Sequence, residues 1–458
     1  MVTFPRRSLG VRTSLSALAV LLLAASLACA APRHARAVLP NGLTVIAVED
    51  PTSAVAAFHL AIRVNPTSIP DKKSGITALS QQAFQYALQD ALRNPANATF
   101  GDEIRGTRSV MGFNTEIDYC EARGQFVNDS LQPALKLLAG LVFVDQPITE
   151  ALVSRSRDAL TNVANDSASN VVECTYYRFL RAFYGTGSPY ARPVHGTQET
   201  LANLTASDIQ GFRTTFIGPN NAILTLVAPR SPQDLIRLAT DTFGSCRRSL
   251  SDTRLTPPPL PEDSRVSVAA LEDWRGASVM VGVPLATFGT PDFLKAQLIF
   301  TLLEGKYGRL QRDENLRGTM GLNRLMDREY QPSVTVLPPS ASPCPYLAMH
   351  TLAMPRLIEP ARVAMLQHLL AFTQDAPSPE ELQAAKNRLL NAYALLDLSR
   401  LNLARSVTCY ELYGQDYRRS WSMEEELRAL TGDSLVAFAK QYFNRHAVGL
   451  IMPGDETE

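Results

Sequence analysis

Apolar and polar positions along the chain follow two periods, one of strand type and one of helix type. Residues 43–50 and 56–64 are strand-length apolar runs, and helical periods follow them before a closing apolar run at 221–229. The same order returns later in the chain, at 266–273, 277–285 and 447–453. The mixed periods predict an α/β (α+β) fold, in which helices pack on a mixed, largely antiparallel sheet.

Three pairs of segments resemble each other across the chain. The longest pair is LANLTASDIQGFRTTF at 201–216 and LRALTGDSLVAFAKQY at 427–442, which are offset by 226 residues. The other pairs are offset by 230 and 223 residues: 147–160 with 377–390, and 48–50 with 271–273. Ordered matches at nearly one offset indicate an internal duplication, so we expect two homologous domains.

A proline-rich segment, SLSDTRLTPPPLPEDSR at 249–265, separates the two copies. Prolines remove backbone donors and favour extended backbone, as a linker requires. We therefore expect an N-terminal domain over 31–248 and a C-terminal domain over 266–458.

The first thirty residues have the pattern of a signal peptide. Arg6, Arg7 and Arg12 precede an apolar run that ends in Ala-Cys-Ala at 28–30. This run is shorter than the roughly 20 residues that a membrane span needs, so we expect cleavage and no integral membrane span. The sequence thus predicts export to the periplasm or the extracellular space, and Cys29 leaves a lipoprotein as the alternative.

Export to an oxidising compartment makes disulfides an option for the other cysteines. Cys120 and Cys174 lie in the first copy, and Cys344 and Cys409 occupy nearby places in the second. We expect the pairs Cys120–Cys174 and Cys344–Cys409, with Cys246 unpaired. Four cysteines allow three connectivities, and five buried thiols are the alternative.

Charge does not indicate a nucleic-acid partner. The 44 basic residues balance 44 acidic ones over 458 residues, so the basic excess that favours binding to nucleic acid is missing. With 45% hydrophobic residues, the chain can bury a sizeable core in each domain.

Residues 38–84 resemble the opening of the insulinase/pitrilysin-like (inverzincin) zinc metallopeptidases, the family that includes mitochondrial processing peptidase subunits and the cytochrome bc1 core subunits. Residues 188–229 and 308–322 resemble two further segments of that family. The likeness covers most of 38–455. It implies two homologous domains in a clam-shell arrangement, in agreement with the duplication.

Active members of this family carry H-x-x-E-H on the helix that follows a Ser-Gly pair, with two histidines as zinc ligands and the glutamate as general base. Gly75 sets the register here, so the histidine positions hold Ala78 and Gln82 and the glutamate position holds Gln81. The resemblance places the third ligand, a glutamate, within 158–165, which contains none. Glutamine is a weak neutral ligand and cannot accept a proton near neutral pH. We therefore expect a pseudo-peptidase without zinc or another cofactor.

Other residues of these motifs have structural interpretations. We interpret Gln81 and Gln82 as polar residues on the exposed face of an amphipathic helix, and His195 as a loop or structural histidine. The resemblance implies substrate contacts at Arg317 and Arg324, although Arg324 stands where the family has a tyrosine. A surface arginine is the alternative for Arg317.

These observations lead to one main hypothesis and two alternatives for the function. The main hypothesis is an exported, non-catalytic subunit that forms a heterodimer with an active peptidase homologue and contributes substrate binding or chamber closure, with a peptide or unfolded polypeptide as ligand. The first alternative is a stand-alone peptide-binding or structural scaffold. The second is a metallopeptidase that uses atypical ligands.

Overall fold

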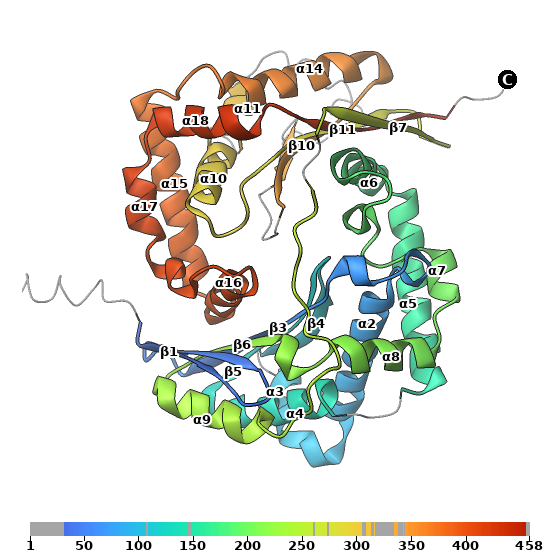
Figure 1. Ribbon diagram of the computed structural model, residues 1–458, viewed down its shortest axis with the longest axis vertical. Helices are drawn as coiled ribbons and strands as arrows, with labels where there is room; N and C mark the ends of the chain where they lie inside the picture. The colour runs from blue at the N-terminus through green and yellow to red at the C-terminus, as the bar shows by residue number, and fades with distance from the viewer. Residues whose placement is uncertain are drawn as a thin grey trace, which may run out of the picture.

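The computed structural model shows two β-sheets, each with its own helices (Figure 1). It describes residues 32–106, 109–144, 148–259, 262–272, 274–304, 308–312, 316, 334–337, 342 and 344–454. The two sheets face each other, and the helices of each half lie mainly on the outer sides (Figure 1). The predicted fold class is confirmed.

The first sheet has six described strands in the order β1-β2-β6-β3-β5-β4. Only β2 and β6 pair in parallel, and the other neighbours are antiparallel. The strands are β1 (His34–Val38), β2 (Thr44–Glu49), β3 (Val55–Arg63), β4 (Val110–Thr115), β5 (Tyr119–Val127) and β6 (Ala222–Ala228). The central strands β3 and β6 are buried almost throughout, because helices cover both faces of this sheet.

The first half also contributes eight helices among the described residues. They are α2 (Ile76–Arg93), α3 (Ala98–Gly106), α4 (Leu131–Val142), α5 (Glu150–Ser169), α6 (Val171–Tyr184), α7 (Gln198–Ala202), α8 (Ala206–Phe216) and α9 (Pro232–Phe243). Side chains of α2, α4, α8 and α9 form one apolar core with the first sheet.

The second sheet has five described strands in the order β7-β11-β8-β10-β9, and β7 and β11 pair in parallel. These strands are β7 (Arg265–Leu271), β8 (Ala277–Pro284), β9 (Thr335–Leu337), β10 (Tyr346–Ala353) and β11 (Ala447–Pro453). The described helices of this half are α10 (Pro291–Leu303), α11 (Arg309–Arg312), α14 (Pro355–Ala371), α15 (Pro379–Asp397), α16 (Arg400–Leu412), α17 (Met423–Ala429) and α18 (Gly432–Tyr442).

The segments that match in sequence occupy the same elements in both halves. The longest pair leads into α8 and α18, and the second pair begins α5 and α15. Thr205 and Thr431 cap α8 and α18 through reciprocal hydrogen bonds with Asp208 and Ser434, respectively. The shared caps show that the repeated sequence encodes the same local structure twice.

The two halves exchange helices. From the first half, α6 packs on β7, β8 and β11 of the second sheet (Figure 1). Phe179 and Phe183 lie in one apolar cluster with Met280 and Tyr346, and the Phe179 and Tyr346 rings are 4.9 Å apart. A Cβ at Gly449 on β11 would lie 2.3 Å from the Phe179 nitrogen, so the helix approaches the strand as closely as glycine allows.

In return, α16 from the second half packs on β3 and β6 of the first sheet. Val407 and Tyr410 join Ile46 and Ile223 in a buried cluster. Polar contacts follow the same pattern in both exchanges, since a threonine hydroxyl of each helix meets a hydroxyl of the sheet. The oxygen–oxygen distances are 2.7 Å for Thr408–Thr225 and 2.6 Å for Thr175–Ser278.

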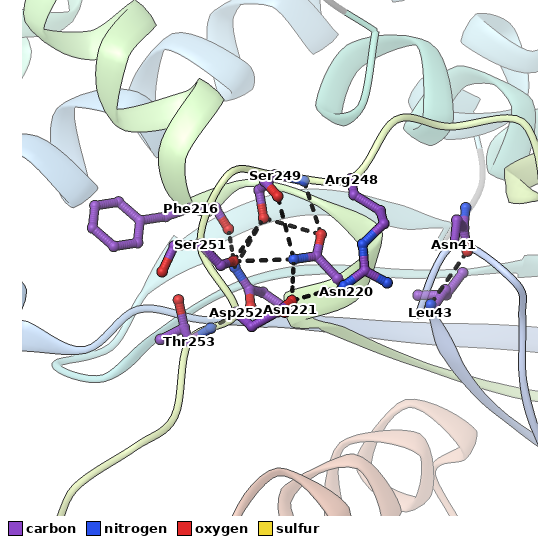
Figure 2. Close-up of polar contacts among 10 residues, drawn as sticks. All are labelled: Asn41, Leu43, Phe216, Asn220, Asn221, Arg248, Ser249, Ser251, Asp252 and Thr253. Carbon is purple, nitrogen blue, oxygen red and sulfur yellow. Dashed lines mark hydrogen bonds and ion pairs between the residues drawn. The ribbon is translucent and has the colours of Figure 1, made fainter.

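The start of the predicted linker is fixed to the first half by two asparagines (Figure 2). Asn221 is fully buried, donates to the Ser251 carbonyl at 2.9 Å and accepts from the Thr253 nitrogen at 2.7 Å. Asn220 accepts from the Ser249 nitrogen at 2.8 Å. The linker therefore leaves the first domain from an anchored position.

The close contact between α6 and β11 gives a test of the helix exchange. We expect Gly449→Ala to lower the free energy of unfolding by roughly 1–3 kcal/mol, because the added methyl group forces α6 away from the sheet. Gly211→Ala in α8 is the control, since a Cβ there meets nothing within 4 Å and alanine favours a helix. Urea unfolding of both variants measures the difference, and equal stabilities would contradict the close packing.

Candidate functional site

The beginning of α2 is held against a loop of the same half. Gly75, which precedes the helix, has a φ of 89°, and a Cβ there would lie 2.8 Å from the His195 carbonyl oxygen. Gly196 also has a positive φ, 78°, and its Cα would be 2.9 Å from that Cβ. Both positions favour glycine, so this contact fixes where α2 begins.

The three degenerate motif positions lie in the first two turns of α2. Ala78 and Gln81 are buried, with 4% and 5% of their surface exposed, and Gln82 is half-buried. The interpretation of Gln81 as a residue of the exposed face is wrong, and that of Gln82 fits only in part. The reason is that α2 packs against α5, α8 and strand β4 of the first sheet, which leaves little of its surface in water.

Gln81 lies beside Cys120 of β5 in a site with few polar partners. Burial raises the pKa of the Cys120 thiol to about 12, although a hydrogen bond with Gln81 opposes the rise. The Gln81 Oε1 atom is buried and has no hydrogen-bond partner among the described residues. An unpaired amide oxygen in the core costs free energy of folding. As a neutral amide, the side chain also cannot accept a proton near neutral pH, so it cannot serve as a general base.

The donor set at this place does not fit zinc. A catalytic zinc site needs three protein ligands, whereas α2 offers a methyl group and two amides. The neighbouring helix α5 carries no glutamate after Glu150. In the part of the chain that the structure describes, no three His, Cys, Asp or Glu side chains are grouped so that they could hold a metal ion.

The strand beside α2 has a free edge. β4 lies at the end of the first sheet and, among the residues that the structure describes, pairs only with β5. The Phe113 nitrogen does not face β5 but donates to Gln85 Oε1 of α2 at 3.1 Å. Because backbone directions alternate along a strand, the N–H groups of Met111 and Thr115 also point away from β5. This edge can pair with another extended chain. Its central outward-pointing N–H group, that of Phe113, is hydrogen-bonded to the Gln85 side chain.

A cavity of about 900 Å³ lies next to this region, between α5, α6, β7 and the loop that contacts α2. Tyr177, Arg178 and Arg181 of α6 line it together with His195. Burial lowers the pKa of His195, so the imidazole is neutral near pH 7. The volume and the mixture of apolar and basic groups are typical of ligand-binding cavities.

The cysteines do not form the predicted disulfides, because all five described cysteines are free. The helix exchange separates each predicted pair. Cys120 lies in the core of the first sheet, whereas Cys174 belongs to α6, which packs on the second sheet. Cys344 borders the second sheet, whereas Cys409 belongs to α16 on the first.

Arg317 and Arg324, which the resemblance suggested as substrate contacts, lie outside the described residues. Their role stays a prediction. Sequence reasoning missed Gln85 and the free edge of β4. The available signal was the short β4–β5 hairpin that follows α2 and α3, but the position of a strand within a sheet follows from long-range pairing.

The buried amide of Gln81 generates a stability prediction. We expect Gln81→Met to raise the free energy of unfolding by about 1 kcal/mol, because it replaces an unpaired oxygen by an apolar group of similar size. Gln82→Met at the half-buried neighbouring position should change it by less than about 0.5 kcal/mol. Chemical denaturation of the two variants compares them, and a loss of stability in Gln81→Met would show that the amide is satisfied.

Comparison with known proteins identifies the fold. Residues 203–389 match the family model described as the peptidase M16 inactive domain. The chain is similar to the structure of a protease from Helicobacter pylori, with 19% identity, a TM-score of 0.77 and coverage of 93% of this chain and 100% of the other. No curated protein matches the chain.

Two other solved structures share the fold. One is the peptidase M16 inactive domain from Pseudomonas fluorescens, with 15% identity, a TM-score of 0.76 and coverage of 93% of this chain and 99% of the other. The second is a chain of complex III2 from Candida albicans with Inz-5 bound, with 14% identity, a TM-score of 0.71 and coverage of 91% and 95%. The resemblance to the insulinase-like family is thus confirmed.

Among the described residues, no helix combines the length and the apolar character that crossing a bilayer requires. The fold extends over nearly the whole chain, and the inactive-domain match covers part of both halves. Residues 203–389 of this chain thus match the peptidase M16 inactive domain, and the chain shares its fold with a solved protease and a solved peptidase M16 inactive domain.

Proposed function

We propose that this protein acts by binding an extended polypeptide along the free edge of β4. The observation that carries the proposal is the contact between Gln85 and Phe113, which shows a backbone donor of β4 turned away from its own sheet. Addition of a strand to a sheet edge is a common way to bind peptides, since main-chain hydrogen bonds supply affinity without a specific sequence. A bound peptide would replace the Gln85 side chain at this donor.

The proposal extends to export and to pairing with an active peptidase homologue. The pattern of residues 1–30 supports export to the periplasm or extracellular space. Two observations support pairing: the positions of the zinc ligands hold other residues, and the fold is otherwise kept. A subunit that only binds substrate needs the β4 edge and the 900 Å³ cavity but no zinc. The chain would then work without a cofactor of its own.

A peptide-binding measurement tests the role of the β4 edge. We expect Gln85→Ala to bind fluorescein-labelled β-casein, an unfolded polypeptide, roughly five-fold more tightly, because the Phe113 donor becomes free. Met111→Pro should weaken binding several-fold, because it removes an outward-pointing donor without breaking the ladder to β5. Fluorescence anisotropy measures both affinities.

Gln82→Ala is the matched control, since it removes the neighbouring glutamine of α2 and should leave the affinity unchanged. Unchanged binding in both Gln85→Ala and Met111→Pro would exclude the β4 edge as the binding site. Circular dichroism of each variant confirms that the fold is intact before affinities are compared.

A second experiment tests the pairing. We expect the purified mature chain to contain no stoichiometric zinc and to have no peptidase activity, and to bring down a zinc-containing active homologue from its native extract. Metal analysis and peptidase assays on the chain alone and on the captured complex measure this. Capture of no homologue would favour the stand-alone scaffold, and one zinc per chain would favour atypical ligands.

A further inference from the structure

A second, smaller cavity of about 140 Å³ lies where the two halves meet. It is enclosed by α6, by β10 and by the turn that joins β4 to β5. Its walls combine two carboxylates, Glu116 and Asp118, with five tyrosines, Tyr176, Tyr177, Tyr184, Tyr190 and Tyr346. Tyrosine rings and acidic groups around a small space suit an organic cation.

Asp118 forms the buried acidic part of this cavity. The residue is 1% exposed, and its Oδ1 atom accepts a hydrogen bond from the Tyr413 hydroxyl at 3.1 Å. Its Oδ2 atom is buried and has no partner among the described residues. Burial raises the pKa of Asp118 to about 7, which reflects the cost of an ionised carboxylate without a counter-ion.

The cations near this cavity already have partners. Arg405 of α16 lies with its Nη2 3.6 Å from Glu116 Oε1, and its Nε is 3.6 Å from Glu121 Oε2. Arg192 lines the cavity, but its guanidinium donates to the Ile69 carbonyl at 3.0 Å and forms an ion pair with Asp71. Neither arginine is hydrogen-bonded to Asp118 in the described contacts.

Four of the five tyrosine hydroxyls are also engaged with protein groups. Tyr176 and Tyr346 share a hydrogen bond of 2.7 Å, and Tyr184 donates to the Cys344 carbonyl at 2.8 Å. Tyr190 donates to the Thr256 carbonyl at 3.4 Å. With the hydroxyls fixed in this way, what the tyrosines can offer a ligand is the negative faces of their rings, which attract a cation.

We propose that this cavity binds a primary alkylammonium group, with Asp118 as its counter-ion and the tyrosine rings around its aliphatic stem. An ammonium group is a compact charge that one free carboxylate oxygen can satisfy, whereas the planar guanidinium of arginine favours two. The alkylammonium can be a lysine side chain of a bound polypeptide or a free alkylamine.

The lysine form of the ligand rests on the proposed function. β4 ends at Thr115, one residue before Glu116, so a polypeptide along the β4 edge leads to the mouth of the cavity. Glu116 is only half-buried, as are Ile117, Arg192 and Val194, and the cavity therefore reaches the surface on this side. The free-amine form does not depend on β4.

Isothermal titration calorimetry with small probes tests the proposal. We expect the full chain at pH 8 to bind n-butylamine and N-acetyl-lysinamide, and not N-acetyl-Nε-acetyl-lysinamide, which has no charge. Asp118→Asn should weaken binding of both amines at least ten-fold. Affinity should also fall about ten-fold from pH 8 to pH 6, because a cation requires the ionised carboxylate and Asp118 has a pKa of about 7.

Asp129→Asn, which neutralises an exposed acid, is the control and should leave both affinities unchanged. No binding of either amine, equal binding of the acetylated probe, or equal affinity in Asp118→Asn with an intact fold would overturn the proposal. A preference for N-acetyl-lysinamide supports the lysine form, and a preference for n-butylamine supports the free amine. Met111→Pro should weaken polypeptide binding several-fold while keeping n-butylamine binding, so failure of the β4 proposal is distinguishable from failure of this one.

Discussion

The exchange of α6 and α16 between the halves is the constraint on which the rest of the structure depends. Each sheet has two apolar faces, and its own half covers only one of them. The second face is buried by the exchanged helix, with Phe179 and Phe183 on one side of the molecule and Val407 and Tyr410 on the other. Separating the halves would expose both clusters to water, at a cost of tens of cal/mol for each Å² of apolar surface.

The candidate functional features lie along the junction that this exchange creates. The loop at His195 and Gly196 fixes the start of α2, and its other side borders both cavities. The start of α2 is thus fixed by backbone contacts, and Ala78 and Gln81 stand where the resemblance places a ligand and the general base. Retained geometry without ligands is what a binding role requires, because strand addition at β4 uses backbone groups.

The sequence predicted local structure well and long-range packing poorly, for a physical reason. Periodicity and capping residues give the elements and the duplication, and Gly75 gave the correct start of α2. The same patterns do not say which sheet a helix covers. The aromatic residues on α6 indicate burial, but they gave no sign that α6 crosses to the other half, so the pairing of Cys120 with Cys174 was wrong. Burial of Gln81 was missed for the same reason.

The exchange also has a consequence for how the chain is made. The last strand of the first sheet ends at Ala228, and the helix that covers its second face begins at Arg400. Ribosomes add roughly 5–20 residues per second, so this apolar face stays exposed for on the order of 10–30 seconds before α16 is synthesised. During that time Ile46 and Ile223 lie on an uncovered surface of the nascent chain. This fold therefore requires protection from aggregation during synthesis, either by a chaperone or by secretion before folding.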